Sequence, residues 1–381
     1  MKLLDKKILE EKLQSRIGDD VESGRVGGAA VCVMQNGEVV YKNCFGYKDA
    51  ETKEQLTDGA LYRMASMTKP ITAVCIMILA EKGKLSITDP VSKYFPDFAH
   101  MNIGELSENG ELRIKCEATR QITIENLLSH TSGLMCREIG DAQAAQMTAA
   151  DKENLETAVK YYENVMLDFE PGEKDWYSPV AAFDVLARII EIVSGMKFAD
   201  FARENIFAPL GMDDTTFTPS EEAWGKMIKM SDFKDGKAVN ADVPKCVFAD
   251  FPASYTCGGA GVVSCLKDYS KFAQMLLNEG EYGDVRILSG ESVKEMQIPR
   301  PIFGDFPRCE IWGLGVRVNK NGFYKSLPEG AYGWSGAYGT HFWVDIENKI
   351  TAVYMKNSRY DGGSGAKTAA NFEKDVYAAL K

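Results

Sequence analysis

The stretch SMTKPITAVCIMILA, residues 66–80, determines how the rest of this sequence is interpreted. After Pro70 only Thr72 is polar, so a helix here is apolar on every side and is expected in the centre of the core. The run is too short to span a bilayer. Ser66 begins the helix and Lys69 lies one turn later on the same face, which brings a hydroxyl and an amine together.

Ser66 and Lys69 are suited to act as a nucleophile and its base. Burial penalises a charged amine, so a lysine in apolar surroundings favours its neutral form, which can accept a proton from a serine hydroxyl. The Ser66 backbone N–H, at a helix N-terminus, also points toward an oxyanion formed by attack. The competing interpretation is a helix-capping serine with a lysine that extends to solvent. This segment alone leaves both open.

The spacing S-x-x-K is weak evidence by itself, because it begins at five serines: Ser66, Ser194, Ser231, Ser264 and Ser364. Ser194 precedes a glycine at a predicted helix end, Ser231 lies in a charged loop, and Ser364 lies among glycines. Ser264 precedes a predicted helix whose Asp268 and Lys271 indicate a solvent-exposed N-cap. Only Ser66 combines the spacing with an apolar helix.

The whole chain has the composition of an ordinary globular protein. With 381 residues and 42.1 kDa, the chain has the length of about two to three typical domains. These can form one interleaved fold or separate domains. Apolar residues make up 45 % and charged residues 26 %, which argues against disorder. The net charge of −11 repels phosphate backbones, so nucleic acid is not an expected partner.

The cysteines, the histidines and the N-terminus indicate a cytoplasmic protein without a metal. The nine cysteines form no C-x-x-C pair and lie mostly singly in apolar stretches, as reduced thiols do. Only three histidines occur and there is no H-E-x-x-H, so we expect no zinc site. The G-x-G candidates, such as Gly259-Ala260-Gly261, lack the third glycine of a dinucleotide site, and no cofactor is expected. The N-terminus alternates charged and apolar residues, so no signal peptide is expected, although a removed signal would leave no trace.

The order of predicted elements indicates one sheet built from both ends of the chain. A hairpin is expected over 28–45, where two strand-like runs flank Asn36-Gly37. Further helices are expected at 3–17, 122–128, 181–194, 198–207, 269–277 and 369–380. Strands return at 312–319, 340–346 and 351–355. The prediction is an α/β (α+β) fold, in which an antiparallel sheet is flanked by helices and a mostly helical domain is inserted.

Several motifs follow one another in a recognisable order. These are YRMASMTKP (62–70), LLSHTSGL (127–134), FEPG (169–172), WYS (176–178), PLGM (209–212), GGAGVVS (258–264) and GWSGAYGTHFWVD (333–345). Together they resemble the landmarks of the serine β-lactamase-fold hydrolases, which include class C β-lactamases, DD-peptidases and family VIII carboxylesterases. The resemblance covers about residues 27–355 and implies a β-lactamase/transpeptidase-like fold. It implies one catalytic unit over 1–381, with an α/β subdomain at approximately 1–85 plus 300–381 and a helical subdomain at approximately 86–299.

The resemblance also implies a role for each matching residue. Ser66 would be the acylated nucleophile, and Lys69 and Tyr177 would share the proton transfers. Which of these two is the base stays open. The backbone N–H groups of Ser66 and Ala337 would form the oxyanion hole. The third motif would contact the substrate through Trp334, Ser335 and Gly336.

Two positions depart from the pattern of the β-lactamases and peptidases. Their Tyr-x-Asn is replaced by Tyr177-Ser178-Pro179, and proline has neither a side-chain amide nor a backbone N–H. Their Lys-Thr/Ser-Gly is replaced by Trp334-Ser335-Gly336, which removes the cation that meets a substrate carboxylate. An indole favours an apolar or aromatic substrate group instead. Both differences are similar to the esterase branch of the family.

His130 and His341 raise the alternative of a Ser–His–Asp triad. The sequence contains no G-x-S-x-G, which removes the main support for a nucleophile-elbow hydrolase. Neither histidine has an obvious partner serine in a nucleophile context, and the resemblance implies structural roles for both. We therefore expect packed or capping histidines.

The sequence predicts a serine hydrolase, and in particular a carboxylesterase that acts on small acyl esters through a Ser66 acyl-enzyme. The alternatives are a weak β-lactamase or D-amino-acid peptidase, an acyltransferase on the same site, and an inactive descendant that only binds ligands. The presence of Ser66, Lys69 and Tyr177 together argues against the last. The expected partner is a small ester or lactam substrate, and both a monomer and a dimer fit the sequence.

Overall fold

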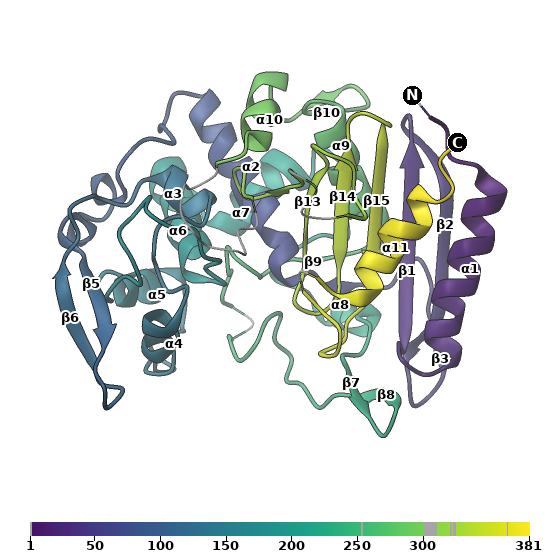
Figure 1. Ribbon diagram of the computed structural model, residues 1–381, viewed down its shortest axis with the longest axis horizontal. Coiled ribbons are helices and arrows are strands. Elements are labelled where there is room, and N and C mark those ends of the chain that lie inside the picture. Colours follow the sequence, from purple (N-terminus) through teal and green to yellow (C-terminus); the bar gives the residue numbers. More distant parts are fainter. Residues whose placement is uncertain (1, 253, 301–310, 321, 323–324, 364) are drawn as a thin grey trace.

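The computed structural model describes residues 2–252, 254–300, 311–320, 322, 325–363 and 365–381. Its central element is a seven-stranded sheet in which every neighbouring pair of strands is antiparallel. In spatial order the strands are β12 (Arg317–Val318), β13 (Tyr332–Ser335), β14 (His341–Asp345), β15 (Ile350–Met355), β1 (Gly28–Gln35), β2 (Glu38–Asp49) and β3 (Glu54–Gln55). The two ends of the chain therefore build one sheet, as predicted (Figure 1).

Helices cover both faces of this sheet. Helices α1 (Lys6–Glu22) and α11 (Lys367–Tyr377) lie side by side on one face (Figure 1). Helix α9 (Leu266–Leu277) packs against β1, β14 and β15 on the other. Helix α2 (Thr68–Glu81), which carries the apolar run, belongs to the same core as α9.

Strand β1 shows why the sheet needs cover on both sides, because all eight of its residues are buried. Cys32 and Met34 belong to the larger hydrophobic core, together with α2 and α9. Val31 and Val33 belong to the smaller core, together with α1 and α11. Successive side chains of a strand point to opposite faces, so a strand that is apolar throughout must lie between two layers.

The remaining described α-helices lie between β3 and β12 in the sequence. They are α3 (Ile124–Leu128), α4 (Glu138–Ala144), α5 (Leu155–Tyr162), α6 (Ala181–Ser194), α7 (Phe198–Ala202), α8 (Glu221–Lys226) and α10 (Gly290–Gln297). A π-helical turn, Arg203–Phe207, continues α7, and 3₁₀ helices occupy Ala65–Met67, Val91–Lys93 and Pro96–His100. Within the described residues, no helix has the length and apolar character needed to cross a membrane.

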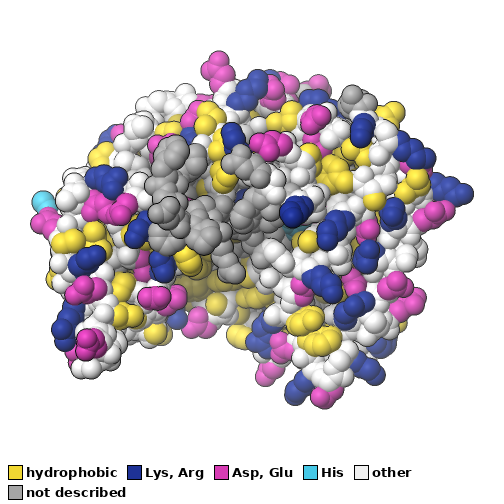
Figure 2. All heavy atoms as spheres, in the orientation of Figure 1, with side chains coloured by type: hydrophobic (Ala, Val, Ile, Leu, Met, Phe, Trp, Pro, Cys, Tyr) yellow, Lys and Arg dark blue, Asp and Glu magenta, His cyan; other side chains and the backbone are white. Residues whose placement is uncertain are grey.

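Short two-stranded ladders complete the architecture. They are β4 (Tyr62–Arg63) with β9 (Val263–Ser264), β5 (Asn102–Leu106) with β6 (Leu112–Glu117), β7 (Ser231–Lys234) with β8 (Lys237–Asn240), and β10 (Glu281–Tyr282) with β11 (Val285–Arg286). On the face shown in Figure 2, side chains of both charges are interspersed, and hydrophobic side chains gather in a recess between the helical region and the sheet.

Some expected elements differ from those observed. The strand predicted at 312–319 is reduced to β12, because Gly313 and Gly315 interrupt it: Gly315 has a φ of 70° and its N–H bonds to Leu128 O. The hairpin β5–β6 lies in a region predicted to be mainly helical. The eight described cysteines form no disulfide with one another. Helix α9 packs on the sheet although it lies within 86–299, and the division into two subdomains at the stated boundaries stays a prediction.

Candidate active site

The candidate nucleophile Ser66 stands in a constrained turn between β4 and α2. Ala65 has a φ of 46°, in the left-handed region that non-glycine residues rarely adopt. Thr68 Oγ1 donates a 2.7 Å hydrogen bond to Ala65 O, and Tyr269 Oη donates a 2.8 Å bond to Met67 O. These bonds fix the backbone on both sides of Ser66, which is 7 % exposed.

Lys69 and Tyr177 both reach the Ser66 hydroxyl. Tyr177 Oη donates a 2.6 Å hydrogen bond to Ser66 Oγ, and Lys69 Nζ lies 3.5 Å from the same oxygen. Lys69 is fully buried, and its Nζ donates to Pro179 O at 2.6 Å and to Gly259 O at 2.9 Å. The fold therefore brings together the three side chains that the sequence singled out: Ser66 from the 3₁₀ turn before α2, Lys69 from α2, and Tyr177 from the segment before α6.

Aromatic rings hold Tyr177 in place. Its ring stacks on Trp312, with centroids 5.8 Å apart, and lies 5.3 Å from Trp334 and 4.6 Å from His130. Trp334 is only 3 % exposed, and its indole N–H has no hydrogen-bond partner among the described residues. Trp334 thus packs against the catalytic tyrosine candidate, and its predicted contact with substrate stays a prediction.

His130 supports the backbone beside Tyr177. Its Nδ1 accepts a 3.1 Å hydrogen bond from Ser178 N, and its own carbonyl accepts one of 2.9 Å from Trp176 N. Burial, reinforced by the positive charge of Lys69, lowers the pKa of His130 well below its usual value. A neutral, fully buried imidazole bound to the backbone fits the expected structural role.

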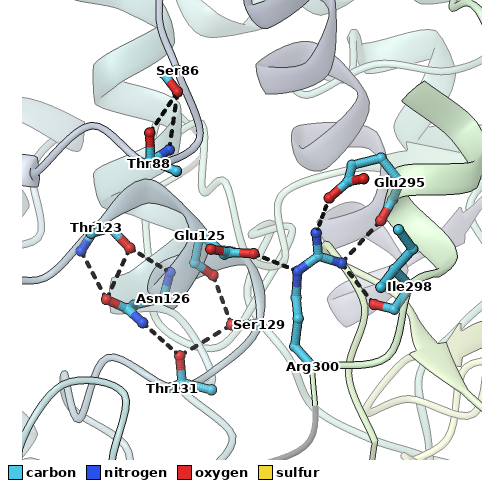
Figure 3. Close-up of polar contacts among 10 residues, drawn as sticks. All are labelled: Ser86, Thr88, Thr123, Glu125, Asn126, Ser129, Thr131, Glu295, Ile298 and Arg300. Atoms are coloured by element: carbon cyan, nitrogen blue, oxygen red, sulfur yellow. Dashed lines mark hydrogen bonds and ion pairs between the residues drawn. The ribbon is translucent and has the colours of Figure 1, made fainter. Parts of the chain in front are cut away.

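A polar network holds the segment that carries His130 (Figure 3). Thr123 caps α3, since its Oγ1 accepts from Asn126 N at 3.2 Å while Asn126 Oδ1 accepts from Thr123 N at 3.0 Å. Asn126 Nδ2 then donates to Thr131 Oγ1 at 2.9 Å. Because this bond spans the turn, it supports the φ of 58° at His130 that directs the imidazole under Tyr177.

Arg300 joins this platform to α10 (Figure 3). Its Nε donates a 2.7 Å bond to Glu125 Oε1 on α3, and its Nη1 donates to Glu295 O at 2.9 Å and Ile298 O at 2.7 Å. The Arg300 backbone N–H donates to Trp312 O at 2.8 Å. The ring that stacks on Tyr177 is therefore connected to α3 and α10.

The third motif lies at the end of β13, with Trp334 and Ser335 in the strand and Gly336 after it, and approaches the nucleophile turn closely. A Cβ added to Gly336 would lie 2.3 Å from Met64 O and 2.2 Å from Thr340 Oγ1, so glycine is required at this contact. Thr340 Oγ1 donates a 2.9 Å bond to Met64 O. Ala337 is exposed, and its N–H donates to no acceptor among the described residues. An unused N–H beside the nucleophile turn is the feature that an oxyanion hole requires.

Ser335 points to the opposite face of the sheet from the nucleophile. Ser335 Oγ lies 2.8 Å from His341 Nδ1, and His341 Nε2 lies 2.9 Å from Glu373 Oε1 on α11. All three side chains are buried. His341 thus has a partner serine that the sequence did not make evident, but this arrangement lies inside the protein. A direct contact of Ser335 with substrate stays a prediction.

A buried carboxylate, Asp184, lies behind Lys69 and was not singled out from the sequence. It is fully buried on α6, and it accepts hydrogen bonds from Tyr255 Oη at 2.6 Å and from Gly258 N at 2.7 Å. Burial raises the pKa of Asp184 to about 6, against the opposing effect of these bonds and of the Lys69 charge. The available signal was a single aspartate inside the apolar helix AAFDVLARII, residues 181–190.

Ser264, another serine of the S-x-x-K pattern, does not share the surroundings of Ser66. Ser264 is fully buried in β9 and shares a 2.7 Å hydrogen bond with Thr215 Oγ1, so its predicted role as a solvent-exposed N-cap is wrong. Asp268, expected at the surface, is also buried. Hydrogen bonds that it accepts from Asp214 N and Thr215 Oγ1 compensate for the loss of water. Ser364 lies outside the described residues.

One group of three described residues has metal-ligand spacing. The ligand atoms of Asp214, Cys265 and Asp268 lie within 4.8 Å of one another. Asp268 already uses one carboxylate oxygen to accept two hydrogen bonds, and burial raises the pKa of the Cys265 thiol to about 12. A thiol that keeps its proton is a poor metal ligand.

Comparison with known proteins agrees with this geometry. The Beta-lactamase family model matches residues 13–373, so the chain belongs to the β-lactamase family of serine hydrolases. The chain is 26 % identical to Esterase EstB of Burkholderia gladioli, over 96 % of this chain and 95 % of that protein. It is 28 % identical to a putative D-alanyl-D-alanine carboxypeptidase of Escherichia coli K12, over 92 % of this chain and 86 % of that protein.

A solved structure shares the same fold. It is described as EstCE1, a hydrolase with promiscuous acyltransferase activity, and matches with a TM-score of 0.81. The match covers 98 % of this chain and 99 % of the other at 23 % identity. The antiparallel sheet with strands from both chain ends and flanking helices is thus the β-lactamase-like fold, as the motifs implied.

Proposed function

We propose that this protein is a carboxylesterase that hydrolyses small esters through an acyl-enzyme on Ser66. The observation that carries the proposal is the contact of one oxygen, Ser66 Oγ, with both Tyr177 Oη at 2.6 Å and Lys69 Nζ at 3.5 Å. The similarity to Esterase EstB over nearly the whole chain supports an ester substrate.

The proposed reaction proceeds in two halves. Ser66 Oγ attacks the ester carbonyl while its proton passes to the Lys69–Tyr177 pair, and the tetrahedral oxyanion binds the N–H groups of Ser66 and Ala337. The pair returns the proton to the departing alkoxide, which leaves as an alcohol. Water then attacks the acyl-enzyme, gives its proton to the same pair, and releases the carboxylic acid as Ser66 recovers its hydrogen.

Two residues favour esters over lactams and acyl-D-alanine peptides. Those substrates present an amide and a carboxylate, yet Pro179 offers no amide and Trp334 offers no cation. Each missing polar contact costs on the order of 1–3 kcal/mol, so the two together lower turnover by roughly a hundredfold or more. A small ester needs neither contact, and an alkoxide leaves more readily than an amine.

The test compares kcat/KM for p-nitrophenyl acetate and butyrate with that for nitrocefin. We expect both esters to exceed nitrocefin by roughly a hundredfold or more. The matched change is Pro179→Asn with Trp334→Lys, which should move the ratio toward nitrocefin. A wild-type preference for nitrocefin over every short ester would replace this proposal by the β-lactamase alternative. Product analysis with an added alcohol separates hydrolysis from acyl transfer.

A further inference from the structure

The segment that binds Lys69 from behind is attached to α2 by a row of hydrogen bonds. Thr72 Oγ1 donates to Gly258 O at 2.7 Å, Lys69 Nζ donates to Gly259 O at 2.9 Å, and Val262 N donates to Thr68 Oγ1 at 3.0 Å. The carbonyl that holds the Lys69 amine therefore belongs to a backbone segment whose position must be fixed.

Asp184 fixes the start of this segment. Its Oδ1 accepts the Gly258 N–H at 2.7 Å, one residue before the carbonyl that binds Lys69, and its Oδ2 accepts the Tyr255 hydroxyl at 2.6 Å. A side chain cannot replace hydrogen at Gly258, because a Cβ there would lie 2.2 Å from Phe183 O. The contact between α6 and this segment is thus tight, and the carboxylate is part of it.

Asp184 also supplies a negative charge to the Lys69 environment. Lys69 and Asp184 interact electrostatically, and both are fully buried, where such interactions are screened far less than at the surface. Lys69 Nζ lies 5.3 Å from the ring centre of Phe183, the residue next to Asp184 on α6. Within the described residues, Lys69 forms no ion pair with a carboxylate in direct contact.

The other titratable groups around this pair do not offer the same charge. Tyr177 and His130 face Lys69, and the pKa of His130 is lowered by burial and by Lys69, so its imidazole is neutral. Cys257, Tyr255 and Tyr162 surround Asp184, and burial raises the pKa of each well above its usual value. These three groups stay protonated and uncharged over the pH range of most hydrolase assays.

We propose that Asp184 is a positioning residue of the hydrolase: its carboxylate fixes the Gly258–Gly259 segment that holds Lys69 and supplies the negative charge against which the Lys69–Tyr177 pair gains and loses its proton. The inference rests on the proposed function, since it assigns the pair a proton-transfer role. It goes beyond that function by naming a residue that touches neither substrate nor Ser66.

The first test is the pH dependence of kcat/KM for p-nitrophenyl butyrate in Asp184→Asn. Loss of the negative charge makes the pair easier to deprotonate, so the ascending limb should move to lower pH by about one unit, with kcat reduced more than KM is changed. The control is Asp268→Asn, which removes another buried carboxylate that also accepts one backbone N–H and one hydroxyl. An ascending limb that stays in place, or moves equally in both variants, overturns the proposal.

A second measurement follows the wild-type enzyme and does not depend on turnover. The ¹³Cε NMR signal of Lys69, assigned by its absence in Lys69→Arg, should shift as Asp184 takes up a proton near pH 6. A Lys69 signal that is constant between pH 5 and about 7 contradicts the proposal. If the signal titrates but no ester is turned over, the proposed function fails while the coupling of Asp184 to Lys69 stands.

Discussion

The Tyr177 hydroxyl donates a 2.6 Å hydrogen bond to Ser66 Oγ, across 111 positions of sequence. The tyrosine ring is held by Trp312, Trp334 and His130, so its hydroxyl has little freedom to leave the serine. Lys69 approaches the same oxygen from α2. The proposed catalysis requires that Tyr177 and Lys69 both contact the Ser66 hydroxyl.

Removing the Tyr177 hydroxyl should separate catalysis from packing. In Tyr177→Phe the ring can keep its aromatic contacts, so we expect kcat to fall by roughly 10²–10⁴ with little change in Tm. The matched control is Tyr161→Phe, which removes a 2.7 Å hydroxyl bond to Gln143 O. Steady-state kinetics and thermal unfolding of both variants decide the point. Near-wild-type kcat in Tyr177→Phe would remove the hydroxyl from the mechanism.

Replacing Lys69 by arginine should abolish activity and leave no rescue at high pH. A guanidinium group does not deprotonate in this range, and it cannot fit the two carbonyl contacts of the lysine at Pro179 and Gly259. The measurement is kcat/KM between pH 6 and 10, with and without EDTA. We expect wild-type activity to rise with pH and to be insensitive to EDTA. An active Lys69→Arg enzyme or loss of activity in EDTA contradicts this expectation.

Ionisation of Asp184 should lower the free energy of unfolding as the pH rises. Burial raises its pKa from 3.8 to about 6, so the folded protein binds this proton more tightly than the unfolded chain. Its contribution is therefore most favourable at low pH and is lost as the pH rises through 6, at a cost of about 3 kcal/mol. Asp184→Asn cannot ionise and should gain by up to that amount relative to wild type between pH 4 and 8.

Urea unfolding of both proteins at several pH values measures this difference. Loss of a hydrogen bond in Asp184→Asn would shift the free energy of unfolding equally at every pH, so only the pH-dependent part reports the buried charge. A difference between the two proteins that is independent of pH would mean that the carboxylate is not perturbed.

The third motif should not tolerate a side chain at Gly336. An added Cβ would lie 2.3 Å from Met64 O, and displacement of this backbone moves the turn that carries Ser66. We expect Gly336→Ala to lower kcat by roughly tenfold to a hundredfold, because small displacements of catalytic groups are costly. The control is Gly225→Ala in α8, where no atom lies within 4 Å of the added Cβ. Equal activity in the two variants contradicts the packing argument.

Helices with strong apolar periodicity were predictable from the sequence. Helix α6 begins and ends at the predicted residues 181 and 194, because its apolar face is continuous and Gly195 ends it with a φ of 72°. The β1–β2 hairpin follows from Asn36-Gly37 in the same way. Strand β13 was missed, because four residues that include Gly333 carry no periodicity and depend on long-range pairing with β14.

The candidate site was predictable in part. Ser66 and Lys69 share one helix turn, so local spacing alone places them together. Tyr177 was located only by the resemblance, since the contact with Ser66 depends on the tertiary fold. The one local signal for Asp184 was an aspartate inside an apolar helix, and the His341–Glu373 contact gave none, because the partners lie at least 32 residues away in the sequence. Buried polar pairs of this kind require the coordinates.

The proposed mechanism requires that Ser66 is the residue that becomes acylated. Intact-mass and peptide mass spectrometry after treatment with a fluorophosphonate tests it directly, with Ser264→Ala as the control serine. We predict one adduct on Ser66 in the wild type and in Ser264→Ala, and none in Ser66→Ala. An adduct that persists in Ser66→Ala, or that maps to another serine in the wild type, would contradict the account.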